Sequence, residues 1–348
     1  MASSSQRLGA LDELRGLLAV GVASYHLSVW FGVFRTGSAM NMAMAKIGNF
    51  GVSAFFMLSG FLIFRLQTWE DVRREGLGRF YLKRFLRLAP IFYLVVALNL
   101  AFSLGWGPQP SARMILENFT LTFGAIHPNH ALVIGGWYVG LVVLLYACFP
   151  VLVWLRDRLG LPFLLVATAG LWAWSLPFTL HAVVEAPMSD RFHLYVQPAN
   201  QLFLFLLGAV GAWAHARWTW RMGTPLFLGL LALMMWAFLR PLPFFSDHLF
   251  VMTGWLRYRY LLMVFALLLL FAFKDATPSP WTRPLVLLGA WSYSSYLLHP
   301  FFHRLIFPHW TGTAGFLMAL VLSFLAAAVA ERWIERPAVT LAKRWKKH

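Results

Sequence analysis

Acidic charge and cysteine are both scarce in this sequence. Of its 348 residues, 13 are Asp or Glu, one is Cys, and 60% are hydrophobic. A soluble domain has about 25% charged residues, whereas the charged share here is 12%. This composition excludes a soluble globular domain. The single Cys148 also excludes a disulfide framework and a thiolate metal site.

Long apolar blocks, by contrast, are abundant. A helix needs roughly 20 consecutive apolar residues to cross a bilayer. The blocks predict an all-α membrane protein, a single bundle of about ten transmembrane helices that forms one domain over residues 1–348. The predicted spans are about 16–34, 47–65, 88–105, 137–155, 161–180, 200–216, 224–240, 257–273, 285–307 and 313–331. The N-terminus lacks a small-residue cleavage site, so a signal peptide is not expected.

Basic residues are unevenly distributed between the predicted loops. With both termini in the cytoplasm, 21 Lys and Arg residues fall in cytoplasmic segments and 8 in outer segments, as the positive-inside rule requires. The net charge of +16 therefore reports membrane topology. No module with interspersed basic and aromatic residues remains that could bind nucleic acid. The basic tail 343–348 is expected to contact lipids of the inner leaflet.

Ionisable side chains are rare within the predicted spans. No carboxylate lies near the middle of a span, so a carboxylate proton relay has little support. His26 lies in the first span and His299 in the ninth, where an ionisable residue is a functional hypothesis by default. A neutral His26 is a candidate general base. For both histidines the alternative is a hydrogen bond between helices.

The spacing of Arg15 and His26 matches one face of a helix. They are eleven residues apart, which is about three turns, with an offset of about 20° and roughly 16 Å along the axis. Arg15 lies at the cytoplasmic end, where a guanidinium binds phosphate in bidentate fashion. Acyl-coenzyme A, with a phosphorylated head and a thioester at its far end, would contact both residues. The alternative for Arg15 is an interfacial anchor.

Three further basic residues, Lys83, Arg84 and Arg87, precede the third predicted span. If this segment is helical, Lys83 and Arg87 are i, i+4 neighbours. Such a cluster is suited to holding further phosphates. A role in membrane topology explains its charge equally well.

Five segments of the sequence carry a resemblance to a known family. They are Leu11-Asp-Glu-Leu-Arg15-Gly16 followed by His26, Phe55-Phe-Met-Leu-Ser59-Gly60-Phe-Leu-Ile63, Arg84-x-x-Arg87-x-x-Pro90, Leu288-Gly-Ala-Trp-Ser292-Tyr293-Ser-Ser-Tyr296-Leu-Leu-His299, and Glu335-Arg-Pro337. In this order, over about residues 8–340, they resemble the acyltransferase 3 family of integral membrane acyltransferases, whose signature is Arg-x10-His. Ser59 and Gly60 are expected chiefly to allow close helix packing.

One position departs from the family pattern. Val142, between Trp137 and Pro150, stands where the family usually has a glutamate. If that acid assists catalysis, this chain does without it or uses another one. The candidates in the outer loops are Glu117, Glu185, Asp190 and Asp247.

The resemblance implies an enzyme that transfers an acyl group, usually acetyl, from cytoplasmic acetyl-coenzyme A to a hydroxyl of a glycan or other acceptor, with no metal. A compatible mechanism uses Arg15, His26 and Tyr293 as catalytic residues. His26 either deprotonates the acceptor hydroxyl or carries the acyl group transiently. The oxyanion would be stabilised by Tyr293, by Ser292, or by a backbone amide near Ser59.

Binding roles follow from the same resemblance. Arg15 would hold the coenzyme A phosphates together with Lys83, Arg84 and Arg87. His299, Trp137 and Tyr138 are candidates for acceptor binding, the aromatic pair by stacking on a sugar. The alternative for that pair is an aromatic belt at the membrane interface.

Four functions remain in competition. The first is O-acylation of an envelope or exported polysaccharide, or its lipid-linked precursor, at the bacterial inner membrane. The second is acylation of a small molecule, the third a glycolipid transporter or flippase, and the fourth a non-catalytic scaffold. The spacing of Arg15 and His26 disfavours the last two, because neither needs a site of donor length. The sequence does not distinguish the first two, and it leaves the oligomeric state open.

Overall fold

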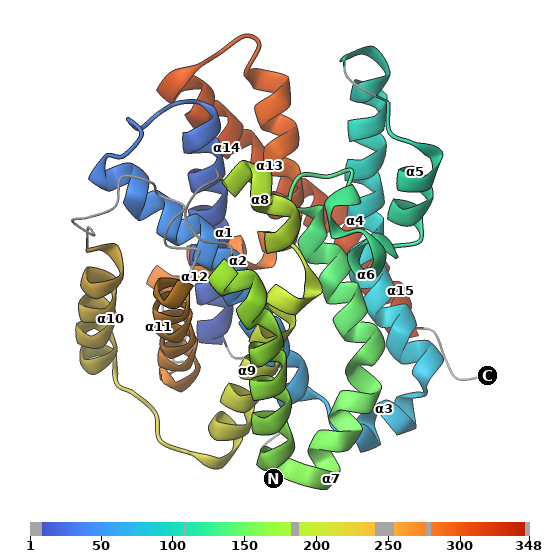
Figure 1. Ribbon diagram of the computed structural model, residues 1–348, viewed down its shortest axis with the longest axis vertical. Coiled ribbons are helices and arrows are strands. Elements are labelled where there is room, and N and C mark those ends of the chain that lie inside the picture. The colour runs from blue at the N-terminus through green and yellow to red at the C-terminus, as the bar shows by residue number, and fades with distance from the viewer. Residues whose placement is uncertain (1–8, 107–108, 182–187, 241–253, 276–279, 345–348) are drawn as a thin grey trace.

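The computed structural model describes residues 9–106, 109–181, 188–240, 254–275 and 280–344. Within these ranges the regular structure is helical, apart from one isolated bridge between Met222 and Lys274 (Figure 1). Two of the predicted substitute acids, Glu185 and Asp247, lie outside the described residues.

The helices follow one another along the whole chain. In the first half they are α1 (Gly9–Trp30), α2 (Ala39–Leu66), α3 (Trp69–Glu75), α4 (Leu77–Trp106), α5 (Ala112–Phe119), α6 (Phe123–Ile126), the 3-10 turn η1 (Pro128–His130) and α7 (Gly136–His181). In the second half they are α8 (Met188–Tyr195), α9 (Pro198–Arg217), α10 (Thr224–Leu239), α11 (Gly254–Phe273), η3 (Pro280–Thr282), α12 (Arg283–Ala290), α13 (Ser292–Ile306), α14 (Gly312–Ala330), the π-helical turn η4 (Glu331–Glu335) and α15 (Arg336–Arg344).

Six helical segments in the described ranges are long and apolar enough to cross a membrane, by length and composition. They are Ala39–Leu66, Leu77–Phe102, Gly136–Thr179, Phe192–Arg217, Gly254–Phe273 and Gly312–Arg344. The protein is therefore an all-helical, multi-pass membrane protein, as predicted. The predicted spans 16–34, 224–240 and 285–307 fall on α1, α10 and the α12–α13 pair, which are outside this set of six.

The helix that carries the span predicted at 88–105 begins well before residue 88. The preceding segment is helical, first as α3 and then as the start of α4, which begins at Leu77. Phe80 anchors this extension because its side chain is fully buried. As a result, Lys83, Arg84 and Arg87 lie on a continuous helix, where Lys83 and Arg87 are i, i+4 neighbours.

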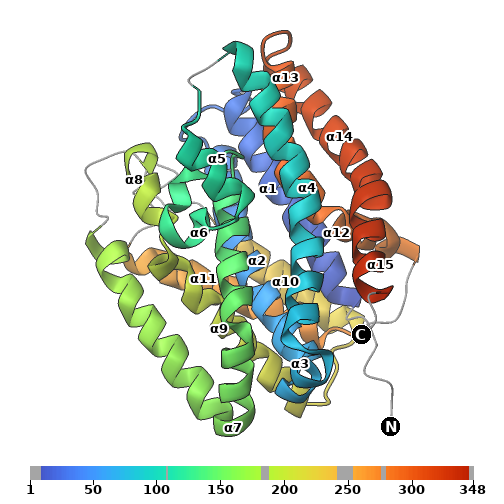
Figure 2. The ribbon, with the colours of Figure 1, turned by 90° about the vertical axis from the view of Figure 1, so that its right-hand side faces the viewer.

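The two spans predicted at 137–155 and 161–180 correspond to the two helical arms of α7, which meet at a sharp bend at Gly160. Gly160 has φ 67° and ψ −148°, a conformation that residues with a Cβ rarely adopt. Figure 2 shows the two arms of α7 meeting at the lower end of the bundle. The glycine therefore allows the chain to reverse direction without a loop.

The single span predicted at 285–307 is broken in the structure. Trp291 separates α12 from α13. The break leaves α12 free to pack directly on α1, where a Cβ on Gly16 would lie 2.2 Å from the carbonyl oxygen of Leu285. A Cβ on Gly289 would lie 2.1 Å from the carbonyl oxygen of Asp12. The two helices thus meet backbone to backbone beside Arg15.

A second close crossing joins α2 to α9. A Cβ on Gly60 would lie 1.9 Å from the carbonyl oxygen of Phe205, and one on Gly208 would lie 1.9 Å from that of Met57. The packing role predicted for Gly60 is confirmed. Small residues at such crossings let membrane helices approach closely and gain van der Waals contact.

Candidate active site

A cavity of about 980 Å³ opens at the end of the bundle where α1 begins and α15 ends. All four residues predicted to bind the donor, Arg15, Lys83, Arg84 and Arg87, line it. Arg336 and Lys343 also line it, although sequence reasoning did not assign them to the site. The only signals for these two were the Glu335-Arg-Pro337 motif and the basic tail.

The cavity has a strong excess of positive charge. Six Lys or Arg side chains line it against two carboxylates, those of Asp12 and Glu331. Asp12 accepts a hydrogen bond from Nη1 of Arg15 at 3.1 Å, and Glu331 accepts one from Nε of Arg336 at 2.5 Å. The remaining basic groups make the cavity suitable for a polyanion.

Aromatic contacts and one ion pair position the basic groups of α4. The guanidinium of Arg84 lies over the rings of Phe80 and Tyr146, 5.0 and 5.6 Å from their centroids. Its Nε is buried and has no hydrogen-bond partner among the described residues. Lys83 pairs with Glu75. Arg84 therefore has one buried donor group without a partner among the described residues.

Glu335 connects three motifs that are distant in the sequence. Its carboxylate is 2% exposed, accepts a hydrogen bond from Ser294, and lies 3.5 Å from Nη1 of Arg87. The serine belongs to the segment that starts at Leu288, and Arg87 to the basic motif of α4. The closing Glu335-Arg-Pro337 motif therefore helps to position a cavity-lining arginine.

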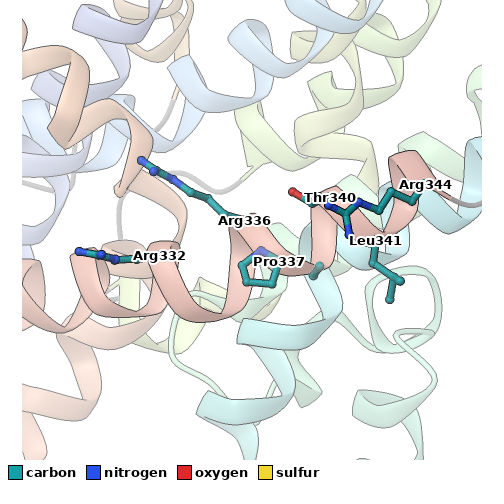
Figure 3. A pocket seen from close by; sticks show the side chains of 7 residues that line it. Arg332, Arg336, Pro337, Thr340, Leu341 and Arg344 are labelled. Carbon is teal, nitrogen blue, oxygen red and sulfur yellow. The ribbon is translucent and has the colours of Figure 1, made fainter.

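The smaller hollow of about 610 Å³ is a surface feature of one helical segment. Its lining residues all lie between Arg332 and Arg344 (Figure 3). Arg336 contributes to both this hollow and the basic cavity. With no second element to enclose it, this surface lacks the walls of a substrate site.

The two histidines predicted within spans are hydrogen-bonded to each other. Nδ1 of His26 lies 3.0 Å from Nε2 of His299, and Nδ1 of His299 lies 3.2 Å from the carbonyl oxygen of Ser295. Because a carbonyl only accepts, Nδ1 of a neutral His299 carries the proton, and its Nε2 accepts from Nδ1 of His26. The Nε2 of His26 is then left with a lone pair, as a general base requires.

The surroundings of the pair fix its orientation. The rings of His26 and His299 are nearly parallel, with centroids 5.2 Å apart, and Trp30 stacks on His26 at 5.1 Å. His299 is 1% exposed, whereas His26 is only partly buried. His26 is thus the member of the pair that substrates can reach.

A series of side-chain contacts runs from the basic cavity to the histidines. Ser59, in the cavity wall, lies 3.0 Å from the hydroxyl of Tyr138. The rings of Tyr138 and Tyr296 are 5.7 Å apart, and those of Tyr296 and His299 are 6.0 Å apart. Sequence reasoning did not name Tyr296 as functional, although its Ser-Tyr-x-x-Tyr motif was visible.

The side chains of Tyr293 and Trp137, two residues predicted to belong to the site, make contacts outside the basic cavity. The hydroxyl of Tyr293 donates to the carbonyl of Leu88 at 2.7 Å, which ties α13 to α4. Trp137 is 5% exposed, with Phe56 and Tyr195 at ring distances of 6.0 and 5.4 Å. The structure therefore brings Arg15 and the basic residues of α4 to one cavity. Tyr138 lies behind its wall, in contact with Ser59, and Trp137 does not line it.

Val142 lies in the apolar core and is 2% exposed. Of the substitute acids predicted for it, Glu117 is hydrogen-bonded to Arg113, His130 and His127. Burial alone would raise the pKa of Glu117, but these hydrogen bonds outweigh it and lower the pKa to about 2. A carboxylate of such low basicity is a poor general base. The group bonded to Nδ1 of His26 is an imidazole rather than a carboxylate.

The fold and this arrangement are those of an integral membrane enzyme, with a basic cavity suited to an anionic ligand and a histidine pair linked to its wall by side-chain contacts. Residues 8–332 match the family model Acyl_transf_3, described as an acyltransferase domain. The chain belongs to this acyltransferase 3 family and is an acyltransferase. An acyltransferase requires an acyl donor and an acceptor.

Several characterised proteins are similar to the chain. The peptidoglycan O-acetyltransferase OatA of Listeria monocytogenes is 32% identical over 108 residues, covering 30% of this chain and 15% of that protein. The O-acetyltransferase OatA of Staphylococcus aureus is 22% identical, covering 96% of this chain and 57% of the relative. The acyltransferase MdmB of Streptomyces mycarofaciens is 23% identical, covering 93% and 88%.

The chain thus spans little more than half the length of the staphylococcal relative and a smaller part of the listerial one. No solved structure matches the chain significantly.

Proposed function

We propose that the protein is a membrane O-acetyltransferase of the bacterial inner membrane. It moves an acetyl group from cytoplasmic acetyl-coenzyme A to a hydroxyl of an envelope or exported polysaccharide, or of its lipid-linked precursor. The observation that carries this proposal is the meeting of Arg15, Lys83, Arg84 and Arg87 in one cavity of about 980 Å³. A series of side-chain contacts through Tyr138 and Tyr296 links the wall of that cavity to the histidine pair.

The donor end of the site suits coenzyme A in size and charge. Pockets for small molecules and cofactors have volumes of about 300–1,000 Å³, and this one is at the upper end. The phosphates bind to the guanidinium groups of Arg15, Arg84 and Arg87, which line the cavity. Lys83, Arg336 and Lys343 supply further positive charge.

His26 is the general base in the proposed reaction. Its Nε2 takes the proton of the acceptor hydroxyl as the oxygen attacks the thioester carbonyl. The tetrahedral intermediate then collapses, the carbon–sulfur bond breaks, and the departing thiolate takes the proton back from His26. His299 is a positioning residue that holds Nδ1 of His26. Tyr293, once released from Leu88, is the proposed oxyanion donor.

The acceptor approaches from the end opposite the basic cavity. His299, Tyr138 and Trp137 border that approach in this proposal. The names of two relatives, both O-acetyltransferases and one of them of peptidoglycan, favour a glycan acceptor. A small-molecule acceptor is the alternative.

We further propose ten membrane spans with both termini in the cytoplasm. The spans are α1, α2, α4, the two arms of α7, α9, α10, α11, the α12–α13 pair and α14. In support, Arg15 near the start of the chain and Lys343 near its end line the same cavity. Lys83, Arg84 and Arg87, which the positive-inside rule also places in the cytoplasm, gather there as well.

Transfer of label from radiolabelled acetyl-coenzyme A tests the proposal. Purified protein in detergent is incubated with a lipid-linked glycan extract or with a panel of small alcohols. His26→Ala is compared with His309→Ala, which alters an exposed histidine away from the site. Labelled glycan in the wild type and in the control, but not in His26→Ala, supports the assignment. Absence of donor binding by folded protein excludes it.

A further inference from the structure

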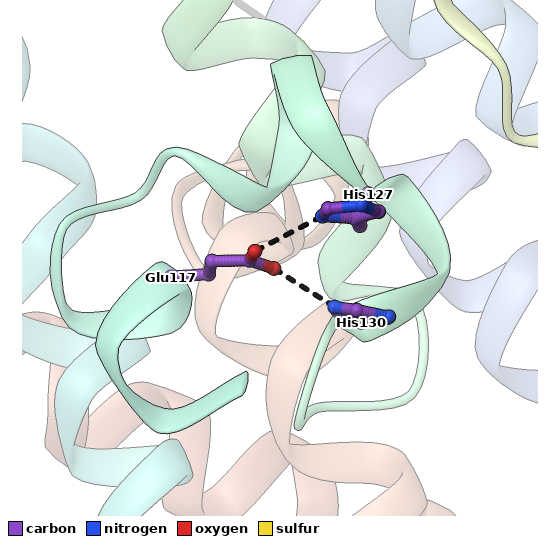
Figure 4. A group of neighbouring side chains, drawn as sticks. All are labelled: Glu117, His127 and His130. Carbon is purple, nitrogen blue, oxygen red and sulfur yellow. Dashed lines mark hydrogen bonds and ion pairs between the residues drawn. The ribbon is translucent and has the colours of Figure 1, made fainter. Parts of the chain in front are cut away.

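A second group of ligating side chains lies outside the basic cavity, in the segment between α4 and α7. Glu117 is in α5, His127 follows α6, and His130 ends η1 (Figure 4). Nδ1 of His127 is 2.9 Å from Oε1 of Glu117, and Nδ1 of His130 is 2.8 Å from Oε2. The three candidate ligand atoms all lie within 4.8 Å of one another.

The local backbone explains why the two imidazoles face the same carboxylate. Pro128 starts the 3-10 turn η1, and His127 and His130 are three residues apart across it. Side chains at i and i+3 eclipse in a 3-10 turn. The two rings accordingly stack with centroids 4.5 Å apart and planes 17° apart.

The neighbouring residues hold this arrangement rigidly. The side-chain amide of Asn118 donates to the carbonyl of His130 at 2.8 Å, and its oxygen accepts from the backbone N–H of Leu132 at 3.0 Å. Leu121 has a positive φ of 57°, unusual for a residue with a branched side chain. This turn brings α6 and η1 back over α5, where Glu117 is 6% exposed.

We propose that Glu117, His127 and His130 bind a divalent transition-metal ion of the Zn²⁺ type. One carboxylate oxygen and two imidazole nitrogens are a ligand set that Zn²⁺ prefers, and they leave a fourth position for water. In a tetrahedral site with such ligands, neighbouring ligand atoms are about 3.3 Å apart. The two imidazole nitrogens now contact different oxygens of the carboxylate, His127 at Oε1 and His130 at Oε2. To share an ion, the carboxylate turns so that one oxygen serves both rings, each contact widens by about half an ångström, and the proton on each Nδ1 moves to Nε2.

Arg113 competes with the ion for this place. Its Nε donates to Oε1 of Glu117 at 2.8 Å, and its Nη2 lies 3.2 Å from Nε2 of His127. The Arg113 side chain is 63% exposed, so its guanidinium is free to turn into water when the ion binds. Removing this positive charge is therefore expected to strengthen metal binding.

The proposed ion would stabilise the segment of α5, α6 and η1, which packs against the start of α7 on the proposed acceptor side of the site. A Cβ on Gly124 of α6 would lie 2.1 Å from the backbone of Gly140 in α7, so the two helices are in direct contact. The carbonyl of Gly135, just before α7, accepts a hydrogen bond from Tyr296 at 2.8 Å. The metal site is thus separate from the donor cavity, and its role is structural.

Zn²⁺ binding is measured by isothermal titration calorimetry on full-length protein, purified with a tag that contains no histidine and stripped with a chelator. One equivalent of Zn²⁺ is expected to bind and to raise the melting temperature. Glu117→Gln and His130→Ala should weaken binding by more than about tenfold. His309→Ala should not change it, and Arg113→Gln should tighten it several-fold.

Co²⁺ absorption provides a readout that does not depend on activity. His130→Cys keeps a ligand at the position and is expected to add a sulfur-to-cobalt charge-transfer band that the wild type lacks. Zn²⁺ binding of equal strength in the wild type, Glu117→Gln and His130→Ala would overturn the proposal. So would failure of folded wild-type protein to bind Zn²⁺, since both results leave these side chains as a hydrogen-bonded cluster only.

Discussion

Nδ1 of His26 lies 3.0 Å from Nε2 of His299, although 273 positions of sequence separate the two residues. The contact joins the first helix to one of the last. It gives His26 a fixed tautomer, because His299 is in turn bonded to the carbonyl of Ser295. His26 thus resembles a histidine base that a second group holds in orientation, and here that second group is an imidazole.

His299→Ala is expected to lower kcat for acetyl transfer by about 100-fold, because His26 loses the group that orients it. The KM for acetyl-coenzyme A should stay nearly constant, since His299 lies away from the donor cavity. His299→Gln should recover part of the rate, because its amide oxygen can accept from Nδ1 of His26. Steady-state kinetics on folded variants check this. An increase in KM with unchanged kcat would contradict a positioning role.

Arg84→Ala is expected to raise the KM for acetyl-coenzyme A by about tenfold, the loss expected for one hydrogen bond to a charged group. The KM for acetyl-pantetheine, which lacks the nucleotide phosphates, should not change. Parallel assays with the two donors measure this difference. Arg217→Ala is the control, because Arg217 is exposed and packs on Trp213 instead of lining the cavity. Equal effects on both donors would assign Arg84 a role outside phosphate binding.

Glu335→Gln is expected to destabilise the protein by about 1–3 kcal/mol, because a buried hydrogen-bonded carboxylate is lost and Arg87 keeps an unpaired charge. The control is Glu70→Gln, which breaks exposed pairs with Arg73 and Arg74 and should change stability much less. Thermal unfolding in detergent compares the two. Similar losses of stability in the two variants would mean that the buried pair contributes no more to stability than the exposed pairs.

Gly16→Ala is expected to reduce stability by about 1–3 kcal/mol, because the new methyl group overlaps the carbonyl of Leu285. Gly170→Ala is the matched control in α7, where a Cβ meets nothing within 4 Å. That change should be neutral or stabilising by about 0.5–1 kcal/mol. Unfolding midpoints of the two variants test the backbone contact between α1 and α12. A stable Gly16→Ala variant would refute that close approach.

Sequence alone was sufficient for the class of fold and for part of the site. Insertion of a segment into a bilayer depends mainly on its own hydropathy, so apolar blocks predict membrane helices without knowledge of their neighbours. Arg15 and His26 were identifiable because both lie on one helix whose geometry is known. The sequence missed one break, at Trp291 between α12 and α13, where a single residue sets the path of the chain.

Only the tertiary structure decided which distant side chains meet. The pairing of His26 with His299, the contact of Glu335 with Arg87, and the joining of Glu117 to two histidines all depend on helix crossings and turns. Such crossings arise from close van der Waals packing summed over whole helices. No local pattern in the sequence determines this total packing energy. The hydropathy of each segment, by contrast, is a local property and determines whether that segment lies in the membrane.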